Sequence, residues 1–196
     1  MTSIGVLAIQ GDFLEHRRML KEIGVDAPEV RLPWQLDSID GLIIPGGEST
    51  TIVQLIDIYN FRAALAEKAK EGMPIWGTCA GMIVLAKSLS DHRPEPLELM
   101  DIDVSRNAFG RQVDSFEAGL DIEEIKGCEP YIAVFIRAPA VDRVGSGVEI
   151  LAKLDDGRPV AVRQNALLAT SFHPELTQDT RVHEFFLKMV EDASYR

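Results

Sequence analysis

The stretch Pro74-Ile75-Trp76-Gly77-Thr78-Cys79-Ala80-Gly81-Met82, which continues as an apolar run to Leu89, decides the fold class of this 196-residue chain. Its first three residues, Pro74-Ile75-Trp76, are apolar and predict a buried strand. The small residues of 77–81 predict a sharp turn, and the run over 82–89 predicts a helix. The stretch is therefore a strand, a turn and a helix in direct succession, which is the basic unit of an α/β fold.

Similar units precede this stretch. They are predicted strands over 4–9, 25–32 and 41–45 and predicted helices over 13–23, 49–58 and 60–72. We expect Asp12 to cap the first helix and Gly24 to end it. Strands that alternate with helices are typical of a parallel sheet covered by helices on both faces. The first half of the chain therefore predicts the central part of such a sheet.

The second half predicts more strands and one closing helix. The predicted strands cover 131–136, 149–154, 159–163 and 166–172, with a hairpin turn at Asp156-Gly157 and an amphipathic helix over 180–191. Residues 91–127 are more polar and predict connecting strands and loops. No repeat or linker is visible. We expect a single domain over 1–196, an α/β three-layer α-β-α sandwich with a mostly parallel central sheet.

The composition is that of a soluble globular protein, with 46% hydrophobic and 26% charged residues. Twenty Lys and Arg against 31 Asp and Glu give a net charge of −11, which argues against nucleic acid or an anionic membrane as the main partner. No apolar run approaches the roughly 20 residues of a membrane span, and residues 1–6 lack the basic segment of a secretory signal. Two cysteines are too few for a disulfide scaffold, so we expect a cytoplasmic, reduced protein.

Cys79 is the first candidate for chemistry. It occupies the nucleophile position of a G-x-nucleophile-x-G elbow between a strand and a helix. The tight turn would raise its side chain above the sheet edge, and the start of the helix would favour the reactive thiolate. The alternative is a buried structural cysteine between two packing glycines. The strand-turn-helix context favours the nucleophile.

His173 and Glu175 are the second candidate. A cysteine nucleophile that releases an amine needs an acid/base partner, usually a histidine that is oriented by an acceptor. His173 follows a predicted strand, at the end where α/β sheets bind their ligands. In extended chain, residues two apart lie on the same side, so the Glu175 carboxylate can reach the His173 ring. The alternative, a loop that merely caps a helix, is weaker beside a cysteine elbow.

The third candidate is the turn at Gly46-Gly47, which ends the predicted strand over 41–45. Two glycines let backbone N–H groups approach a small ligand, as an oxyanion hole requires. The alternative is a plain tight turn with Ser49 as helix cap. The turn is not a nucleotide-binding fingerprint, since neither G-x-G-x-x-G nor G-x-x-x-x-G-K-[ST] is present.

Other polar residues are weaker candidates for a functional role. A buried Arg106, Arg111 or Arg137 could bind a ligand carboxylate, but surface salt bridging is the commoner role of an arginine. His16 could lie on a helix face or at an interface, whereas His92 and His183 have no companions and are predicted to be surface residues. No Cys/His cluster has the spacing of metal ligands, so we expect no metal, and we assign no role to Cys128.

With these motifs together, the chain resembles the class I (triad) glutamine amidotransferases, most closely the family of glutaminase subunits of pyridoxal 5′-phosphate synthases. The matching motifs are Leu7-Ala8-Ile9-Gln10-Gly11 with Glu15-His16, Ile44-Pro45-Gly46-Gly47-Glu48-Ser49-Thr50-Thr51, Gly77-Thr78-Cys79-Ala80-Gly81, Arg106-Asn107-Ala108-Phe109-Gly110-Arg111-Gln112, Phe135-Ile136-Arg137-Ala138-Pro139 and Phe172-His173-Pro174-Glu175-Leu176-Thr177. They span nearly the whole chain. The second and fourth motifs look specific to this family, whereas the elbow and the His-Pro-Glu occur across the class. The resemblance also implies a flavodoxin-like form of the α/β fold.

The resemblance implies hydrolysis of L-glutamine to L-glutamate and ammonia through a Cys thioester. The implied residues are a catalytic triad of Cys79, His173 and Glu175, an oxyanion hole from the N–H groups of Gly47 and Ala80, and glutamine contacts from Gly47, Glu48, Ser49, Arg106, Ile136 and Arg137. It also implies a partner, the synthase subunit of a large multimeric complex that uses the ammonia to build pyridoxal 5′-phosphate. No cofactor is expected in this chain.

Three alternatives remain at this point. The same chemistry could serve another acceptor, as in the glutaminase subunit of imidazole glycerol phosphate synthase. A cysteine hydrolase or stress protein of the DJ-1/PfpI type shares an elbow cysteine but lacks the late His-x-Glu pair. A catalytically dead subunit would only regulate its partner.

Overall fold

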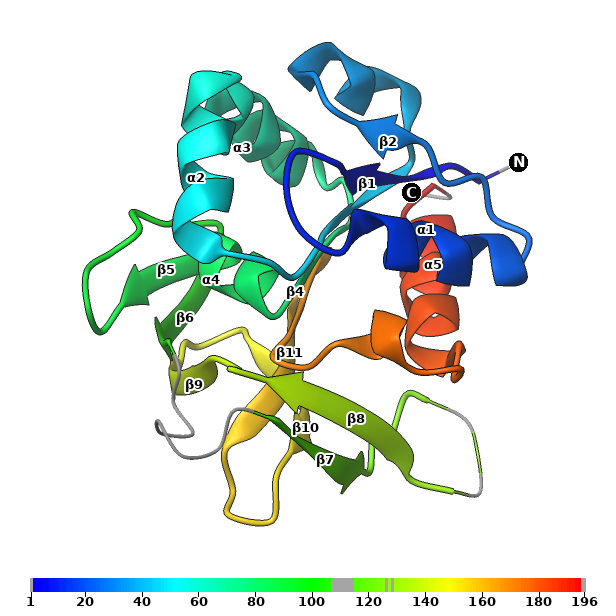
Figure 1. Cartoon of the computed structure of the whole chain (residues 1–196), viewed down its shortest axis with the longest axis vertical. Coiled ribbons are helices and arrows are strands. Elements are labelled where there is room, and N and C mark those ends of the chain that lie inside the picture. The colour runs from blue at the N-terminus through cyan, green and yellow to red at the C-terminus, as the bar shows by residue number, and fades with distance from the viewer. Residues whose placement is uncertain (1, 107–114, 126, 128, 195–196) are drawn as a thin grey trace.

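A seven-stranded sheet forms the centre of the protein, in a computed structural model that describes residues 2–106, 115–125, 127 and 129–194 (Figure 1). In spatial order the strands are β10 (Glu149–Lys153), β11 (Pro159–Gln164), β12 (Leu167–Thr170), β4 (Ile75–Thr78), β3 (Gly41–Ile44), β1 (Ile4–Leu7) and β2 (Glu29–Val30). The five strands from β12 to β2 are parallel, and β11 and β10 continue the sheet in antiparallel pairings. The described residues thus confirm the mostly parallel central sheet that the sequence predicts.

Helices cover both faces of this sheet (Figure 1). The helices α1 (Phe13–Glu22) and α5 (Arg181–Ser194) pack on one face, and α2 (Ser49–Ile58), α3 (Phe61–Glu71) and α4 (Ala80–Leu85) pack on the other. Alternate strand residues supply the two cores, because successive side chains of a strand point to opposite faces. Ile43 and Trp76 belong to the core under α5, whereas Leu42 and Ile75 belong to the core under α2 and α3. These layers confirm the α-β-α sandwich.

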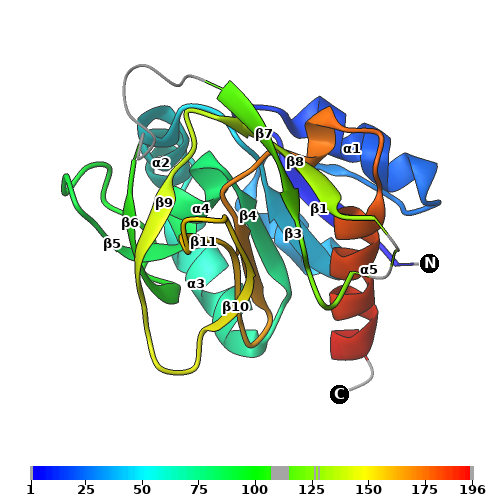
Figure 2. The ribbon, with the colours of Figure 1, turned by 90° about the horizontal axis from the view of Figure 1, so that it is seen from below.

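Two smaller sheets lie beside the edge of the central sheet that carries β10 and β11 (Figures 1 and 2). One consists of β5 (Ala86–Leu89), β6 (Met100–Ser105) and β9 (Ala140–Val144), and the other of β7 (Ser115–Leu120) and β8 (Tyr131–Ile136). The backbone N–H of His173 donates to the carbonyl of Val134 in β8, at 2.8 Å. This bond ties the second small sheet to the loop that follows β12.

Several predicted boundaries are wrong. The helix expected over 82–89 is only α4, because residues from Ala86 on pair with β6 as β5. The strand expected over 25–32 is reduced to the two residues of β2. Asp12 precedes α1 but makes no side-chain capping bond. Pairing between distant segments decides the first two cases, and the sequence pattern alone does not contain that information.

The short 3₁₀ helices Pro33–Ser38 and Pro174–Leu176 complete the described elements. Among the described residues, none of the helices combines the length and the apolar character that a bilayer crossing demands.

Candidate active site

Four loops meet at the carboxyl ends of the adjacent parallel strands β12, β4, β3 and β1. Ligands of open α/β sheets bind at this edge, because successive loops there converge on one crevice. The loops surround a cavity of about 540 Å³. The residues that line it are Asp12, Gly47, Glu48, Ser49, Cys79, Ala80, Ile83, Arg106, Ile136, Arg137, His173 and Leu176. Of the predicted site residues, only Glu175 is missing from the cavity wall, because it lies behind His173.

The backbone of Cys79 has the strained conformation of an elbow, with φ 48° and ψ −103°. Its N–H donates to the carbonyl of Thr170 at 2.8 Å, and this bond fixes the turn against β12. A Cβ atom on Gly81 would lie 2.1 Å from the carbonyl oxygen of Ile44, and one on Gly77 would lie 2.4 Å from the backbone of Gly81. Both flanking glycines are therefore required by close packing, which explains the G-x-C-x-G pattern.

Cys79 is buried but opens into the cavity, with 7% of its surface exposed. Its Sγ lies 3.8 Å from the carbonyl oxygen of Ile136, and Cys79 shares the cavity wall with His173, whose pKa it raises. The helix that follows is shorter than the sequence predicts, since α4 has only six residues. Ala80 is its first residue, so the N–H of Ala80 has no partner within the helix.

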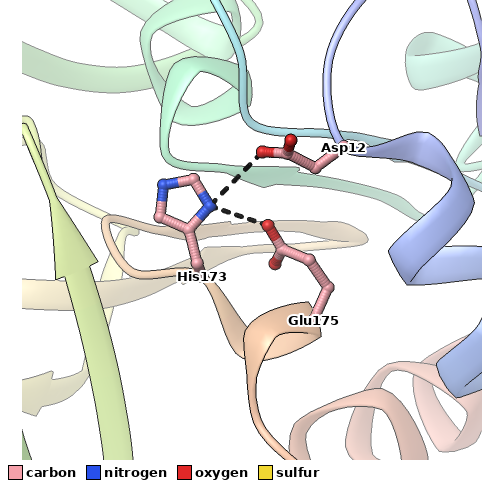
Figure 3. Close-up of side chains that lie close together, drawn as sticks. All are labelled: Asp12, His173 and Glu175. Carbon is pink, nitrogen blue, oxygen red and sulfur yellow. Dashed lines mark hydrogen bonds and ion pairs between the residues drawn. The ribbon is translucent and has the colours of Figure 1, made fainter.

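His173 is hydrogen-bonded to a buried carboxylate (Figure 3). Its Nδ1 lies 2.7 Å from Oε1 of Glu175, whose side chain is completely buried. Its Nε2 points away from that carboxylate. The structure therefore brings together Cys79, His173 and Glu175 in the order sulfur, imidazole, carboxylate, although the cysteine is distant from the other two in the chain.

The charge on His173 is set by its two partners. Burial lowers the pKa of His173, but the hydrogen bonds with Cys79 and Glu175 and the negative charge of both groups raise it further, to about 10. Burial likewise raises the pKa of the Glu175 carboxyl, and the hydrogen bond to His173 partly offsets this effect. These contacts favour the imidazolium form of His173 at neutral pH.

Replacing Cys79 by alanine should lower the pKa of His173, because the variant removes one of the two groups that raise it. An ordinary histidine titrates near 6.5, so between pH 6.5 and about 10 the folded protein holds a proton that the unfolded chain has lost. The stability that comes from the raised pKa of His173 is therefore complete below pH 6.5 and is lost as the pH rises towards 10. NMR titration of the His173 ring in the wild-type chain and in Cys79→Ala measures the shift. An unchanged pKa would show that Cys79 does not raise the pKa of His173.

Gly47 also lines the cavity. Its φ of 152° lies in the region that L side chains rarely adopt, and an added Cβ would lie 2.5 Å from Oε1 of Gln10. The same Gln10 oxygen accepts a hydrogen bond from the N–H of Glu48 at 2.9 Å. The loop after β3 is therefore hydrogen-bonded to the loop after β1.

Glu48 and Ser49 begin α2. The Glu48 carboxylate accepts from the N–H groups of Thr50 and Thr51, at 3.2 and 2.6 Å, and so caps the helix. Burial is the largest single influence on the pKa of Glu48 and raises it, but the hydrogen bonds from the N–H groups and side chains of Thr50 and Thr51 together outweigh burial and lower the pKa. Arg106 lies across the cavity mouth, with Nη1 3.4 Å from Oγ of Ser49 and Nε 2.8 Å from Oδ2 of Asp91.

Ile136, the last residue of β8, and Arg137, which follows it, also line the cavity. Arg137 has a positive φ of 44°. Arg111 and Cys128 lie outside the described residues, as do residues 107–112 of the predicted arginine motif. His92 is exposed, as predicted.

The prediction that His183 is a surface residue is wrong, because both His16 and His183 have no exposed surface. His16 Nδ1 lies 3.0 Å from His183 Nε2, and His16 Nε2 lies 3.2 Å from Oε2 of Glu175. A sequence signal was available, since His183 has helical spacing with the buried Phe186 and Val190 of α5.

Asp12 is a second residue whose place the sequence analysis missed. Its Oδ2 lies 3.7 Å from Nδ1 of His173, beside the Glu175 carboxylate (Figure 3). Ligand-type atoms of Asp12, His173 and Glu175 lie within 4.8 Å of one another, which is close enough for a cation. The His173 nitrogen in this group is already bound to Glu175, so the grouping serves the hydrogen-bond network.

Comparison with known proteins agrees with this geometry. The SNO glutamine amidotransferase family model matches residues 6–192. Pyridoxal 5′-phosphate synthase subunit PdxT of Herpetosiphon aurantiacus is 58% identical over 188 residues, which cover 94% of this chain and 98% of that protein. The PdxT subunit of Thermosipho africanus is 53% identical over 189 residues, which cover 96% and 98%.

A solved structure described as a glutamine amidotransferase has a TM-score of 0.90 and 47% identity, and the match covers 96% of this chain and 98% of that chain. These matches confirm the resemblance that the motifs indicate. The chain belongs to the SNO glutamine amidotransferase family.

Proposed function

We propose that this chain hydrolyses L-glutamine to L-glutamate and ammonia and supplies the ammonia to the synthase subunit of a pyridoxal 5′-phosphate synthase. The observation that carries the proposal is the row of sulfur, imidazole and carboxylate, in which Cys79 and His173 line the cavity and Glu175 lies behind His173. The names of the PdxT relatives support the choice of acceptor. Cys79, His173 and Glu175 are the proposed catalytic residues.

The reaction begins when the Cys79 thiolate attacks the side-chain amide carbon of glutamine. Backbone N–H groups of Gly47 and Ala80 stabilise the oxyanion, and loss of one such donor typically costs roughly 3 kcal/mol. The His173 imidazolium protonates the departing nitrogen, which gives ammonia and a glutamyl thioester. Neutral His173 then takes a proton from water, which hydrolyses the thioester, while Glu175 fixes the ring tautomer.

Glutamine recognition uses the rest of the cavity wall. The guanidinium groups of Arg106 and Arg137 suit the α-carboxylate of the substrate, since an arginine can bind a carboxylate with two parallel bonds. Glu48, Ser49 and the Ile136 carbonyl are polar groups for its remaining donors and acceptors. Glu48 also caps α2, so a change there would alter the loop as well as the contact.

The acceptor of ammonia is part of the proposal. Free ammonia is protonated in water at neutral pH, so it must reach the synthase through a closed path within a multimeric complex. The whole chain over 1–196 acts as one glutaminase domain, and the family match over 6–192 supports this. A reactive Cys79 thiol needs a reducing compartment, which supports a cytoplasmic location.

Glutamate release, measured for the chain alone and with its synthase subunit, tests the function. We expect turnover in the complex and much slower turnover for the chain alone, because the partner orders the loop over 46–49. Equal rates would refute control by the partner. Absence of glutamate release in both samples, with intact folding, would refute the glutaminase function.

A further inference from the structure

The guanidinium group of Arg106 is held from two sides at the mouth of the cavity. Its Nε donates to Oδ2 of Asp91 at 2.8 Å, and its Nη1 lies 3.4 and 3.3 Å from the hydroxyl oxygens of Ser49 and Thr50. Asp91 is not among the described residues that line the cavity, and it belongs to none of the sequence motifs. The proposed reaction therefore gives Asp91 no task.

The small sheet that contains β5 and β6 places Asp91 beside Arg106 (Figure 1). The two strands are parallel, and Leu89 pairs with Val104. Asp91 and Arg106 each follow one of these paired residues by two positions, so the register brings them to the same end of the sheet. The N–H of Ser90 donates to the carbonyl of Val104 at 3.1 Å and continues the pairing past the end of β5. The contact therefore depends on β5, the segment that the sequence predicted to be helical.

Neither fold stability nor charge gives a reason for an aspartate at this position. The side chains of Asp91 and Arg106 are 43% and 28% exposed, and solvent screens ion pairs of such exposure strongly. The Asp91 carboxylate also brings a negative charge close to a residue that is proposed to bind a carboxylate. By charge alone it would weaken the binding of glutamine.

The contact does fix the direction of the guanidinium group. This group has five N–H donors in one rigid plane, and Asp91 occupies the single donor on Nε. Nη2 has no hydrogen-bond partner among the described residues. Arg106 lines the cavity, so its Nη1 and Nη2 end is left for a ligand carboxylate, which can accept two parallel bonds there. A long side chain that is already held loses less conformational entropy when the ligand binds.

We propose that Asp91 is a positioning residue for glutamine recognition: it holds Nε of Arg106 and so presents Nη1 and Nη2 to the α-carboxylate of the substrate before glutamine arrives. The inference rests on the proposed glutaminase function. The α-carboxylate does not react, so its contacts are the same in the ground state and in the transition state. Asp91 therefore acts on KM and leaves kcat unchanged.

The first test is spectroscopic and needs no glutamine. Nitrogen-15 relaxation of the Arg106 Nε–H group, measured on the full chain, reports how well this group is ordered. We expect an ordered Nε–H in the wild-type chain and a mobile one in Asp91→Ala, because the variant removes the acceptor. Equal order in both chains would overturn the inference, whether or not the chain hydrolyses glutamine.

The second test compares Asp91→Ala and Asp91→Asn, each assayed for glutamate release with the synthase subunit. We expect Asp91→Ala to raise KM about 2- to 12-fold at unchanged kcat, the cost of immobilising one long side chain on binding. Asp91→Asn should stay within about twofold of the wild-type KM, because its amide oxygen can still accept from Nε. Equal rises in both variants, a lower KM in either, or a loss confined to kcat would overturn the inference.

The matched control is Asp103→Ala. Asp103 also accepts from an arginine Nε, that of Arg143, but neither residue is among those described on the cavity wall, so KM should not change. A second control asks whether Asp91 acts through Arg106. In a chain that already carries Arg106→Ala, adding Asp91→Ala should change KM less than about twofold.

Independent effects of these two substitutions on KM would overturn the inference. Thermal unfolding of every variant separates lost folding from lost positioning. A wild-type complex that releases no glutamate would refute the proposed function and leave the relaxation result standing.

Discussion

Cys79→Ala should abolish glutamine hydrolysis while glutamine still binds. The variant removes the sulfur that forms the thioester, and Cys79 supplies the only thiol among the described residues that line the cavity. The recognition groups Glu48, Ser49, Arg106 and Arg137 are untouched. Alanine also occupies the positive φ of this position with a smaller side chain than cysteine, so the elbow is expected to persist.

Glutamate release and calorimetric binding of glutamine, both measured in the complex with the synthase, check this result. The matched control is Cys128→Ala, which should keep full turnover. Labelling with 6-diazo-5-oxonorleucine, mapped by peptide mass, should place the adduct on Cys79 alone. Residual turnover of Cys79→Ala near the wild-type rate would refute the nucleophile, and so would a label on Cys128.

Glu175→Gln should lower kcat by up to roughly 10⁴-fold, the size of loss that follows when the orienting carboxylate of a catalytic triad becomes an amide. Oε1 of the carboxylate accepts a hydrogen bond from Nδ1 of His173 at 2.7 Å. An amide carries no negative charge, and its NH₂ group cannot accept the His173 N–H if it takes the position of Oε1. The imidazolium of His173 also loses the negative charge that stabilises it.

Asp12→Asn is the matched control for this variant. Asp12 also has a carboxylate beside His173 Nδ1, but at 3.7 Å the contact is too long for a direct hydrogen bond. We expect a much smaller loss of kcat in Asp12→Asn than in Glu175→Gln. Similar losses in both variants would mean that His173 responds only to local negative charge, and would contradict an orienting role for Glu175.

Local sequence patterns were sufficient for most of the fold. Apolar runs followed by glycine turns located β1, β3 and β4, because a buried parallel strand needs a continuous apolar segment and the turn after it needs small residues. They were insufficient where pairing is distant. The apolar run predicts that Ala86–Leu89 continues a helix, but parallel pairing with β6 makes this segment a strand.

Short motifs likewise contained the candidate catalytic residues. The elbow around Cys79 and the two-residue spacing of His173 and Glu175 are local geometries, so the sequence alone could name them. Only the tertiary structure decided which side chains lie next to His173 and Glu175. His16 and His183 are 167 residues apart, and Asp12 turns towards His173 and leaves α1 uncapped. Those contacts depend on how α1 and α5 pack on the same face of the sheet, and packing between distant segments leaves no periodic trace in either one.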